Sequence, residues 1–391
     1  MQSLGVKVYW AAGVARLRRL VGWAHDPYPP RTPDRRLSPS LGITAALAQA
    51  PRQMALPQNG DGEQALAWGK AARAKLADLT GYDRARAAAP ANPQIVAQLH
   101  EEPVGAHPGP EIVKRSFILR VRPETDVPVH LIYQPPLARG RALPVFLHLA
   151  GSTSGVHLAW GGVRVPIDHQ RIAIGADMAR QAAARGYLAV AIEQIGYGER
   201  GERDLPKASP NRTIDAANHL LLIGRTLMGD GAADVSSVID FLLDGGAGMS
   251  VDPDRLFLFG HSAGGTLAQY AAALDPRISG VLASGSIGPV RQAIAARGSG
   301  GGDGIVPGLL NWFDSADLIA MVAPCAFVGL SGRGDHIYPY DGVAQAVEAA
   351  RPLYASLAAQ ERLAAVPVDG PHRYYATQSW QAFERWIDPQ S

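Results

Sequence analysis

Short apolar runs alternate with longer stretches of helical periodicity from about residue 113 to the end of the chain. Continuous apolar runs are typical of strands buried on both faces, and their alternation with helices indicates a mostly parallel sheet covered on both sides. The runs predict eight strands, at Arg115–Val121, Val129–Tyr133, Leu143–Leu149, Leu188–Ile192, Leu256–Phe259, Gly280–Ala283, Ala326–Leu330 and Ala364–Val368. We therefore expect an α/β fold in which helical crossovers join all but the first two strands, which are close enough to form an antiparallel hairpin.

The residues before this region divide into two segments of different character. Residues 1–60 are rich in Arg, Pro and Ala and show no sustained period, so we expect a poorly ordered N-terminal extension. In residues 61–112, apolar positions recur at helical spacing, at Ala65, Trp68, Ala72, Leu76 and Leu79. This pattern predicts a helical lead-in that packs on an α/β domain formed by residues 113–391.

Two interpretations of the N-terminal extension bear on where the protein works. The basic segment Val8–Trp23 has the composition of a short amphipathic helix that lies on a membrane surface. Alternatively, Arg35-Arg36, the following stretch Leu37–Ala48 and the small residues of Ala48-Gln49-Ala50 resemble an export signal displaced inward from Met1. We expect a cytoplasmic protein by default, with export through residues 35–50 as the alternative.

The segment Gly260-His261-Ser262-Ala263-Gly264 directly follows a predicted strand and opens a predicted helix. This is the pattern of a nucleophile elbow, in which a sharp turn exposes a serine hydroxyl to a histidine base. The two glycines permit the turn because neighbouring backbone can approach them closely. We therefore expect Ser262 to be a nucleophile.

An acid and a base follow the elbow in the order that such a motif requires, each on a loop after a predicted strand. Asp335 follows the run 324–330, and His372 follows the run 363–368. We assign Asp335 as the acid and His372 as the base. The competing residues fit other roles better: we expect His336 to face away from the site, Asp341 to begin a helix, and Asp369 to form the turn before His372.

Acyl transfer at a serine also needs an oxyanion hole, which is built from two backbone N–H groups. The residue after the nucleophile, Ala263, supplies the first. The second comes from the loop after the third predicted strand, where Gly151 and Ser152 are the candidates. The elbow residue His261 and the arginine Arg200 are candidate substrate contacts, although Arg200 has an alternative role as a brace between loops.

Composition excludes several classes of function. Of the 391 residues, 47% are hydrophobic and 18% are charged, which predicts a globular protein with a sizeable core. The net charge of +2 gives little support to nucleic-acid binding. The single cysteine, Cys325, excludes an intrachain disulfide and a cysteine-based metal site. No apolar run approaches the roughly 18 residues that a membrane span requires.

These motifs give the chain a clear resemblance to the α/β-hydrolase superfamily, within it to bacterial acetyl xylan esterase-like and dienelactone hydrolase-like proteins. The resemblance covers about residues 61–388 and is carried by the elbow with its extension to Ile278, by Gly196–Arg200 and by Pro307–Leu310. Two positions depart from the usual pattern. Glu193 stands where an Asp often follows the fourth strand, and His148-Leu149 replaces the common His-Gly pair.

The resemblance implies an α/β-hydrolase fold and hydrolysis of a carboxylic ester through an acyl-serine, with no metal and no organic cofactor. The expected partner is a small-molecule ester, such as an acetylated carbohydrate or another short-acyl ester. Two alternatives remain open at this point. One is a serine peptidase of the same superfamily, and the other is a non-catalytic binding protein on the same fold.

Overall fold

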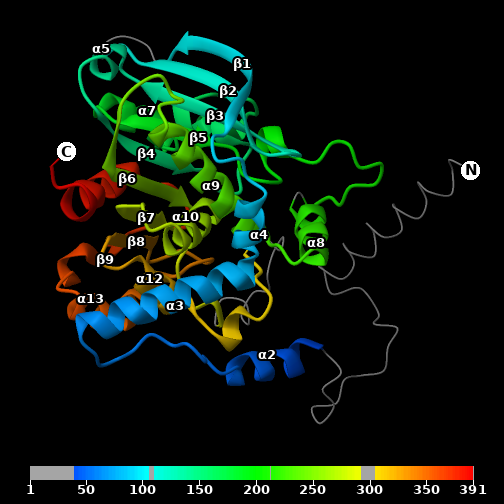
Figure 1. Cartoon of the computed structure of the whole chain (residues 1–391), viewed down its shortest axis with the longest axis vertical. Coiled ribbons are helices and arrows are strands. Elements are labelled where there is room, and N and C mark those ends of the chain that lie inside the picture. The colour runs from blue at the N-terminus through cyan, green and yellow to red at the C-terminus, as the bar shows by residue number, and fades with distance from the viewer. Residues whose placement is uncertain (1–38, 105–109, 212, 292–303, 391) are drawn as a thin grey trace, which may run out of the picture. The chain divides into compact units, whose positions relative to one another are not determined.

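A computed structural model of the chain describes residues 39–104, 110–211, 213–291 and 304–390 (Figure 1). Its backbone contacts divide the chain into two units, residues 1–49 and residues 50–391. In the first unit the described part is helix α2 (Pro39–Gln49), which covers most of the apolar stretch of the candidate export signal. The basic segment 8–23 and Arg35-Arg36 lie outside the described residues. Among the residues that are described, no helix has the length and apolar character needed to cross a membrane.

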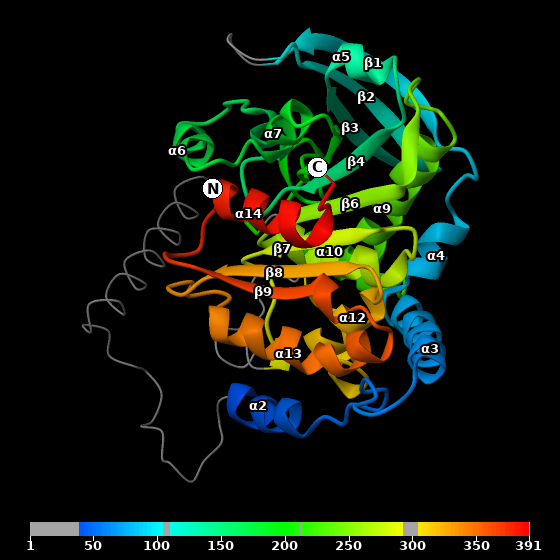
Figure 2. The same ribbon diagram turned by 90° about the vertical axis from the view of Figure 1, so that its left-hand side faces the viewer.

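The second unit is built on a nine-stranded sheet with the order β1-β2-β3-β5-β4-β6-β7-β8-β9, whose strands lie side by side in Figure 2. The strands are β1 (Gln94–Pro103), β2 (Val113–Arg122), β3 (Thr125–Tyr133), β4 (Leu143–Leu149), β5 (Leu188–Ile192), β6 (Val251–His261), β7 (Gly280–Ser284), β8 (Ala326–Gly332) and β9 (Leu363–Val368). The pairs from β1 to β5 along this order are antiparallel, and those from β5 to β9 are parallel. This arrangement confirms the predicted mostly parallel sheet that begins with an antiparallel hairpin.

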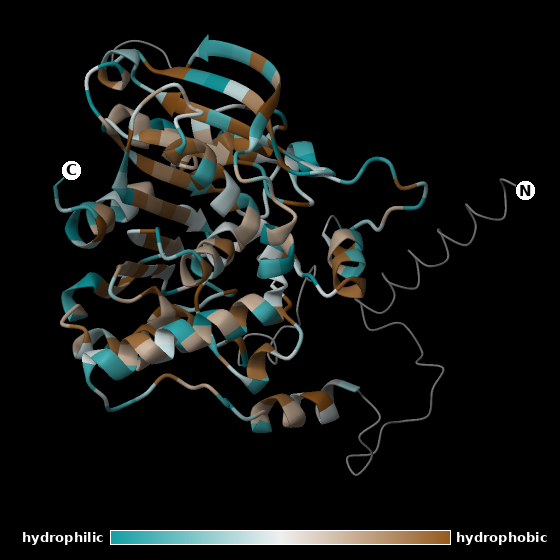
Figure 3. Ribbon diagram, in the orientation of Figure 1, coloured by the Kyte–Doolittle hydropathy of each residue, from teal (hydrophilic) through white to brown (hydrophobic). Residues whose placement is uncertain are grey.

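The sheet has one strand more than the sequence predicts. Strand β1 falls within the segment 61–112 that was expected to be helical. It is an edge strand that is exposed along almost all of its length, and it carries polar residues such as Gln98, His100 and Glu101. Figure 3 shows the difference, with hydrophobic colouring on the central strands and hydrophilic colouring on much of β1. A strand without a buried face lacks the apolar alternation by which a strand is recognised in a sequence.

Helices cover both faces of the sheet and form two hydrophobic clusters with it. One cluster joins the sheet to α3 (Gly62–Thr80), α9 (Leu227–Leu243), α10 (Ala263–Leu274), α12 (Ser315–Val322) and α13 (Tyr340–Ser356). The other joins it to η1 (Val156–Trp160), α7 (Met178–Ala184), α14 (Ala376–Ala382) and the π-helical turn η5 (Phe383–Ile387). The remaining short helices are α4 (Tyr82–Ala87), α5 (Pro135–Ala138), α6 (Ile167–Ala173), η2 (Gly198–Arg200), α8 (Ile214–Leu222), η3 (Leu309–Asn311) and η4 (Gln360–Arg362). The parallel part of the sheet is therefore buried on both sides, which explains why its strands are continuous apolar runs.

Helix α3 shows how the lead-in segment attaches to the sheet domain. Its start is capped by Asp61, whose side chain accepts a hydrogen bond from the backbone N–H of Gln64, and it ends at Gly81 in the left-handed conformation. Its apolar stripe is buried, and the Arg73 guanidinium donates hydrogen bonds to the carbonyl oxygens of Ala273 and Met321. These bonds tie the helix to the ends of α10 and α12.

Candidate active site

The elbow predicted at residues 260–264 forms the junction between β6 and α10. Ser262 lies between them with φ 56° and ψ −126°, one of two non-glycine residues with positive φ among those that the structure describes. A Cβ atom on Gly264 would lie 2.0 Å from the carbonyl oxygen of Leu149, and one on Gly260 would lie 2.1 Å from that of Gly264. Only glycine fits at either position. The glycines therefore allow β6, α10 and the end of β4 to meet around a strained, half-buried serine.

Asp335 and His372 form a hydrogen-bonded pair, 2.7 Å apart between His372 Nδ1 and Asp335 Oδ2. Asp335 follows β8 and is only 3% exposed, and His372 lies on the loop between β9 and α14. The second carboxylate oxygen accepts hydrogen bonds from the backbone N–H groups of Ile337 and Tyr338, each at 2.8 Å. Burial raises the pKa of Asp335, but the hydrogen bonds from His372 and these backbone groups outweigh it, so that the net pKa lies below its usual value. The carboxylate is therefore ionised at neutral pH and holds His372 by Nδ1.

The elbow and the imidazole meet at the end of strand β7. The backbone N–H of Ser262 donates to the carbonyl oxygen of Ser284 at 2.8 Å. The next residue, Gly285, has φ 55°, and a Cβ atom there would lie 3.1 Å from His372 Cε1. Within the described residues no hydrogen bond joins the Ser262 hydroxyl to His372. Such catalytic bonds are often long in free enzymes and shorten when substrate binds.

The structure separates the competing acids from the imidazole. The Asp369 side chain is 97% exposed and forms an ion pair with Arg333, and Asp341 is an exposed residue in the first turn of α13. The expectation for His336 does not match its position. This exposed ring lies edge-on to the imidazole of His372, with 6.4 Å between the ring centroids. It stands beside the candidate base rather than facing away from it.

The two candidate donors on the oxyanion loop, Gly151 and Ser152, have different surroundings. The backbone of Gly151 lies close to the hydroxyl of Tyr374, a buried side chain whose pKa is raised by burial to about 12. Ser152 is exposed, and its hydroxyl lies 3.0 Å from that of Tyr197. A Cβ atom on Gly151 would lie 2.7 Å from the carbonyl oxygen of His261, so this loop runs directly against the elbow. The arrangement favours the N–H of Ser152 as the partner of the Ala263 N–H, which lies at the positive end of α10.

His261 and Arg200, the two candidate substrate contacts, both point into the protein. The His261 ring lies 4.9 Å from that of His372 and 4.3 Å from that of Tyr374, and its Nδ1 is 3.1 Å from the Ser284 hydroxyl. Burial lowers the pKa of His261 to about 3, so the ring is neutral. This position favours a packing role behind the base over contact with a substrate.

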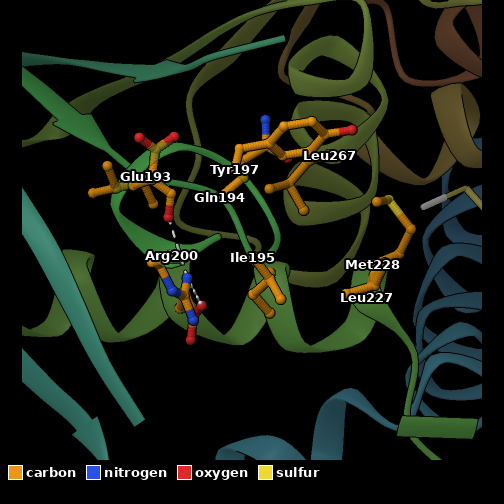
Figure 4. A pocket seen from close by; sticks show the side chains of 11 residues that line it. Glu193, Gln194, Ile195, Tyr197, Arg200, Leu227, Met228 and Leu267 are labelled. Carbon is orange, nitrogen blue, oxygen red and sulfur yellow. Dashed lines mark hydrogen bonds and ion pairs between the residues drawn. The ribbon is translucent and has the colours of Figure 1, made fainter. Parts of the chain in front are cut away.

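Arg200 connects the loop after β5 to helix α9. Its guanidinium donates to the carbonyl oxygen of Glu193 at 3.2 Å (Figure 4). It also donates to the carboxylate of Asp234 at 2.7 Å. Beside it, a cavity of about 20 Å³ lies among Tyr197, Met228 and Leu267, with room for about one water molecule. The contacts of Arg200 therefore match the alternative role as a brace between segments of the chain.

The sequence analysis did not identify the buried residues that contact the site from the protein interior, above all Tyr374 and Gln194. The Gln194 side chain donates a hydrogen bond to the carbonyl oxygen of Ala150, at the start of the oxyanion loop. Neither residue belongs to a motif. The one signal in the sequence that could have identified them is that Tyr374 is close to His372 and Gln194 is close to the end of β5. Among the residues described, no three His, Cys, Asp or Glu side chains come together in a way that could hold a metal ion.

Comparisons with known proteins bear on the fold. No protein-family model matches the chain. It is 26% identical over 178 residues to "Putative hydrolase YtaP" of Bacillus subtilis (strain 168), which covers 45% of this chain and 56% of that relative. The chain thus matches little more than half the length of the relative.

Solved structures match over much more of the chain. A "putative acetyl xylan esterase" from Bacteroides fragilis NCTC 9343 is 16% identical, with a TM-score of 0.66 over 88% of this chain and 84% of that one. A CE15 glucuronoyl esterase from Teredinibacter turnerae T7901 is also 16% identical, with a TM-score of 0.60 over 96% and 98% of the two chains. An acetyl xylan esterase from Paenibacillus sp. R4 is 19% identical, with a TM-score of 0.51 over 80% and 94%. Together with the sheet order and the strained elbow serine, these likenesses establish that the chain has the α/β-hydrolase fold predicted from its sequence.

Proposed function

We propose that the chain is a serine-dependent carboxylic ester hydrolase that acts through an acyl-serine intermediate. The observation that carries this proposal is the hydrogen-bonded pair of the buried Asp335 and the half-buried His372, placed at the same end of β7 as the strained Ser262. Ser262, Asp335 and His372 follow the strands β6, β8 and β9. These strands are parallel, so their carboxyl ends lie on the same side of the sheet, and only β7 lies between β6 and β8. This arrangement supports the roles of nucleophile, base and acid that acyl transfer requires.

In the proposed reaction, His372 removes the proton from Ser262 as the hydroxyl oxygen attacks the ester carbonyl. Asp335 keeps the Nδ1 proton in place, so that Nε2 is free to accept, and stabilises the imidazolium that forms. The N–H groups of Ala263 and Ser152 bind the oxyanion. His372 then protonates the leaving alkoxide, and a water activated by the same histidine releases the acid. These steps need neither a metal nor an organic cofactor.

For the substrate we propose a small ester, in particular a short-acyl ester carried on a carbohydrate. The support comes from the names of the structural neighbours, which include acetyl xylan esterases and a glucuronoyl esterase. Exposed polar groups beside the base fit a hydroxylated alcohol. His336 stands next to His372, where the leaving alcohol is protonated, and the exposed Ser152 lies on the facing loop.

The deciding experiment compares the wild type with Ser262→Ala and Ser250→Ala. Ser250 is an exposed serine at the opposite end of β6, so its replacement is a matched control. We expect wild type and Ser250→Ala to hydrolyse p-nitrophenyl acetate and to gain the mass of one fluorophosphonate adduct, whereas Ser262→Ala does neither. Assays with the butyrate and octanoate esters and with an acetylated xylo-oligosaccharide would then size the acyl and alcohol sites. Folded wild type that neither turns over nor labels would contradict the proposal and favour a binding protein on this fold.

A further inference from the structure

Glu193, the first residue after β5, is a buried carboxyl group that joins two loops. Its side chain is 1% exposed, and Oε2 accepts hydrogen bonds from the backbone N–H groups of Val156 at 2.9 Å and Glu199 at 3.3 Å. Val156 begins η1, directly after the oxyanion loop of residues 150–155. Glu199 lies in η2, on the loop after β5. The carboxyl group therefore fixes the far end of the oxyanion loop to the loop of residues 193–200.

The backbone around Glu193 is shaped to admit this side chain. Gly155 has φ 149° and Gly198 has φ 46°, conformations that side-chain-bearing residues rarely adopt. A Cβ atom on Gly155 would lie 3.0 Å from Glu193 Oε2, and one on Gly198 would lie only 1.8 Å from it. Both glycines thus leave space that the carboxyl group fills. Neither loop could close around the carboxyl group in this way with a larger residue at these positions.

The same loop of residues 193–200 also holds the near end and the middle of the oxyanion loop. Gln194 donates to the carbonyl oxygen of Ala150, and the Tyr197 hydroxyl lies 3.0 Å from that of Ser152. Arg200 in turn donates a hydrogen bond to the backbone carbonyl oxygen of Glu193, as Figure 4 shows. The candidate oxyanion donor Ser152 therefore sits on a loop that is fastened on both sides of it.

We propose that Glu193 is a positioning residue that sets the Ser152 N–H for the oxyanion, and does so as a hydrogen-bond acceptor without needing a negative charge. This inference rests on the proposed ester hydrolase function. The surroundings do little to stabilise a negative charge on this group, because Oε1 is buried and accepts no hydrogen bond among the described residues. Burial also raises the pKa of Glu193, partly offset by its hydrogen bonds to Val156 and Glu199.

The test compares three variants of the full chain by kcat and KM for p-nitrophenyl acetate. Glu193→Gln keeps the acceptor oxygen without the charge, and Glu193→Met keeps the length of the side chain without an acceptor. Glu202→Gln is the matched control, since the exposed Glu202 also accepts two backbone N–H bonds on the connection after β5. We expect Glu193→Gln and Glu202→Gln to stay within about threefold of wild type with superimposable pH profiles. A misplaced oxyanion donor costs about 10- to 100-fold, so Glu193→Met should lose this much in kcat while KM changes less than about threefold.

The rate of fluorophosphonate labelling should fall in parallel with kcat, while thermal unfolding shows that each variant is folded. A Glu193→Met enzyme with wild-type kcat would overturn the proposal, as would a Glu193→Gln enzyme that loses as much kcat as Glu193→Met. Should Glu193→Met not fold, Glu193→Asp decides the matter. It keeps the carboxyl group but withdraws it by one methylene, so kcat should fall at least about tenfold at unchanged KM. A wild type without turnover or labelling would instead refute the proposed function, and this inference with it.

Discussion

Replacing Asp335 by asparagine tests the candidate acid, because the structure predicts which way the new amide must turn. One carboxylate oxygen of Asp335 accepts the N–H groups of Ile337 and Tyr338, and the other accepts His372 Nδ1. An asparagine has one acceptor oxygen and one NH2 donor. If the oxygen keeps the two backbone bonds, the NH2 group faces Nδ1 and makes it an acceptor. The imidazole proton then moves to Nε2, which can no longer take the proton of Ser262.

The opposite orientation of the amide is also unfavourable, because its NH2 group would face two backbone N–H groups. Water cannot separate these donors, since residue 335 is only 3% exposed. In serine proteases the same replacement lowers kcat about 10⁴-fold, which corresponds to about 5.5 kcal/mol of transition-state stabilisation. We expect Asp335→Asn to lose about 10³- to 10⁴-fold in kcat for p-nitrophenyl acetate, with the fold intact by circular dichroism. Asp369→Asn, a change at an exposed aspartate three residues before His372, should keep wild-type kcat. Retention of more than about a tenth of kcat by Asp335→Asn, or a large loss in Asp369→Asn, would refute the assignment of the acid.

Two further predictions concern buried positions near the site. Burial lowers the pKa of His148 to about 3, so it stays neutral in the folded protein while it binds a proton below about pH 6.5 when unfolded. The unfolded state therefore binds more protons, and stability should fall as the pH drops from about 6.5 towards 3, by up to about 1.4 kcal/mol per pH unit for this residue. His148→Leu should make that fall shallower in urea unfolding at pH 7, 6 and 5, and an unchanged slope would contradict the reasoning. Gly264→Ala should abolish turnover or folding, because its Cβ would lie 2.0 Å from the Leu149 carbonyl oxygen. The control is Gly69→Ala in α3, where a Cβ meets nothing within 4 Å. Thermal unfolding should show that this variant gains up to about 1 kcal/mol in free energy of unfolding. An active, stable Gly264→Ala would show that β4 and α10 can move apart.

The parts of the structure that the sequence predicts are those that depend on local pattern. The parallel strands are buried on both faces, so each is an apolar run, and Ser262, Asp335 and His372 could be named as candidates because each follows such a run. Strand β1 was missed because an exposed edge strand has no buried face to mark it. The position of His336 was missed for a different reason. His336 directly follows Asp335 on an irregular loop, and the sequence alone does not fix the direction of a side chain there.

The oxyanion loop shows where local pattern stops being enough. In the sequence Gly151 and Ser152 are equivalent candidates, since both follow the same apolar strand. What distinguishes them is that Gly151 is buried, with its backbone close to Tyr374 on the loop that also carries His372, whereas Ser152 is exposed. The same loop therefore both presents the candidate base and packs against one of the two possible oxyanion donors. The choice of donor is thus a property of the assembled sheet edge, and the remaining candidate, Ser152, is held by the loop that contains Glu193.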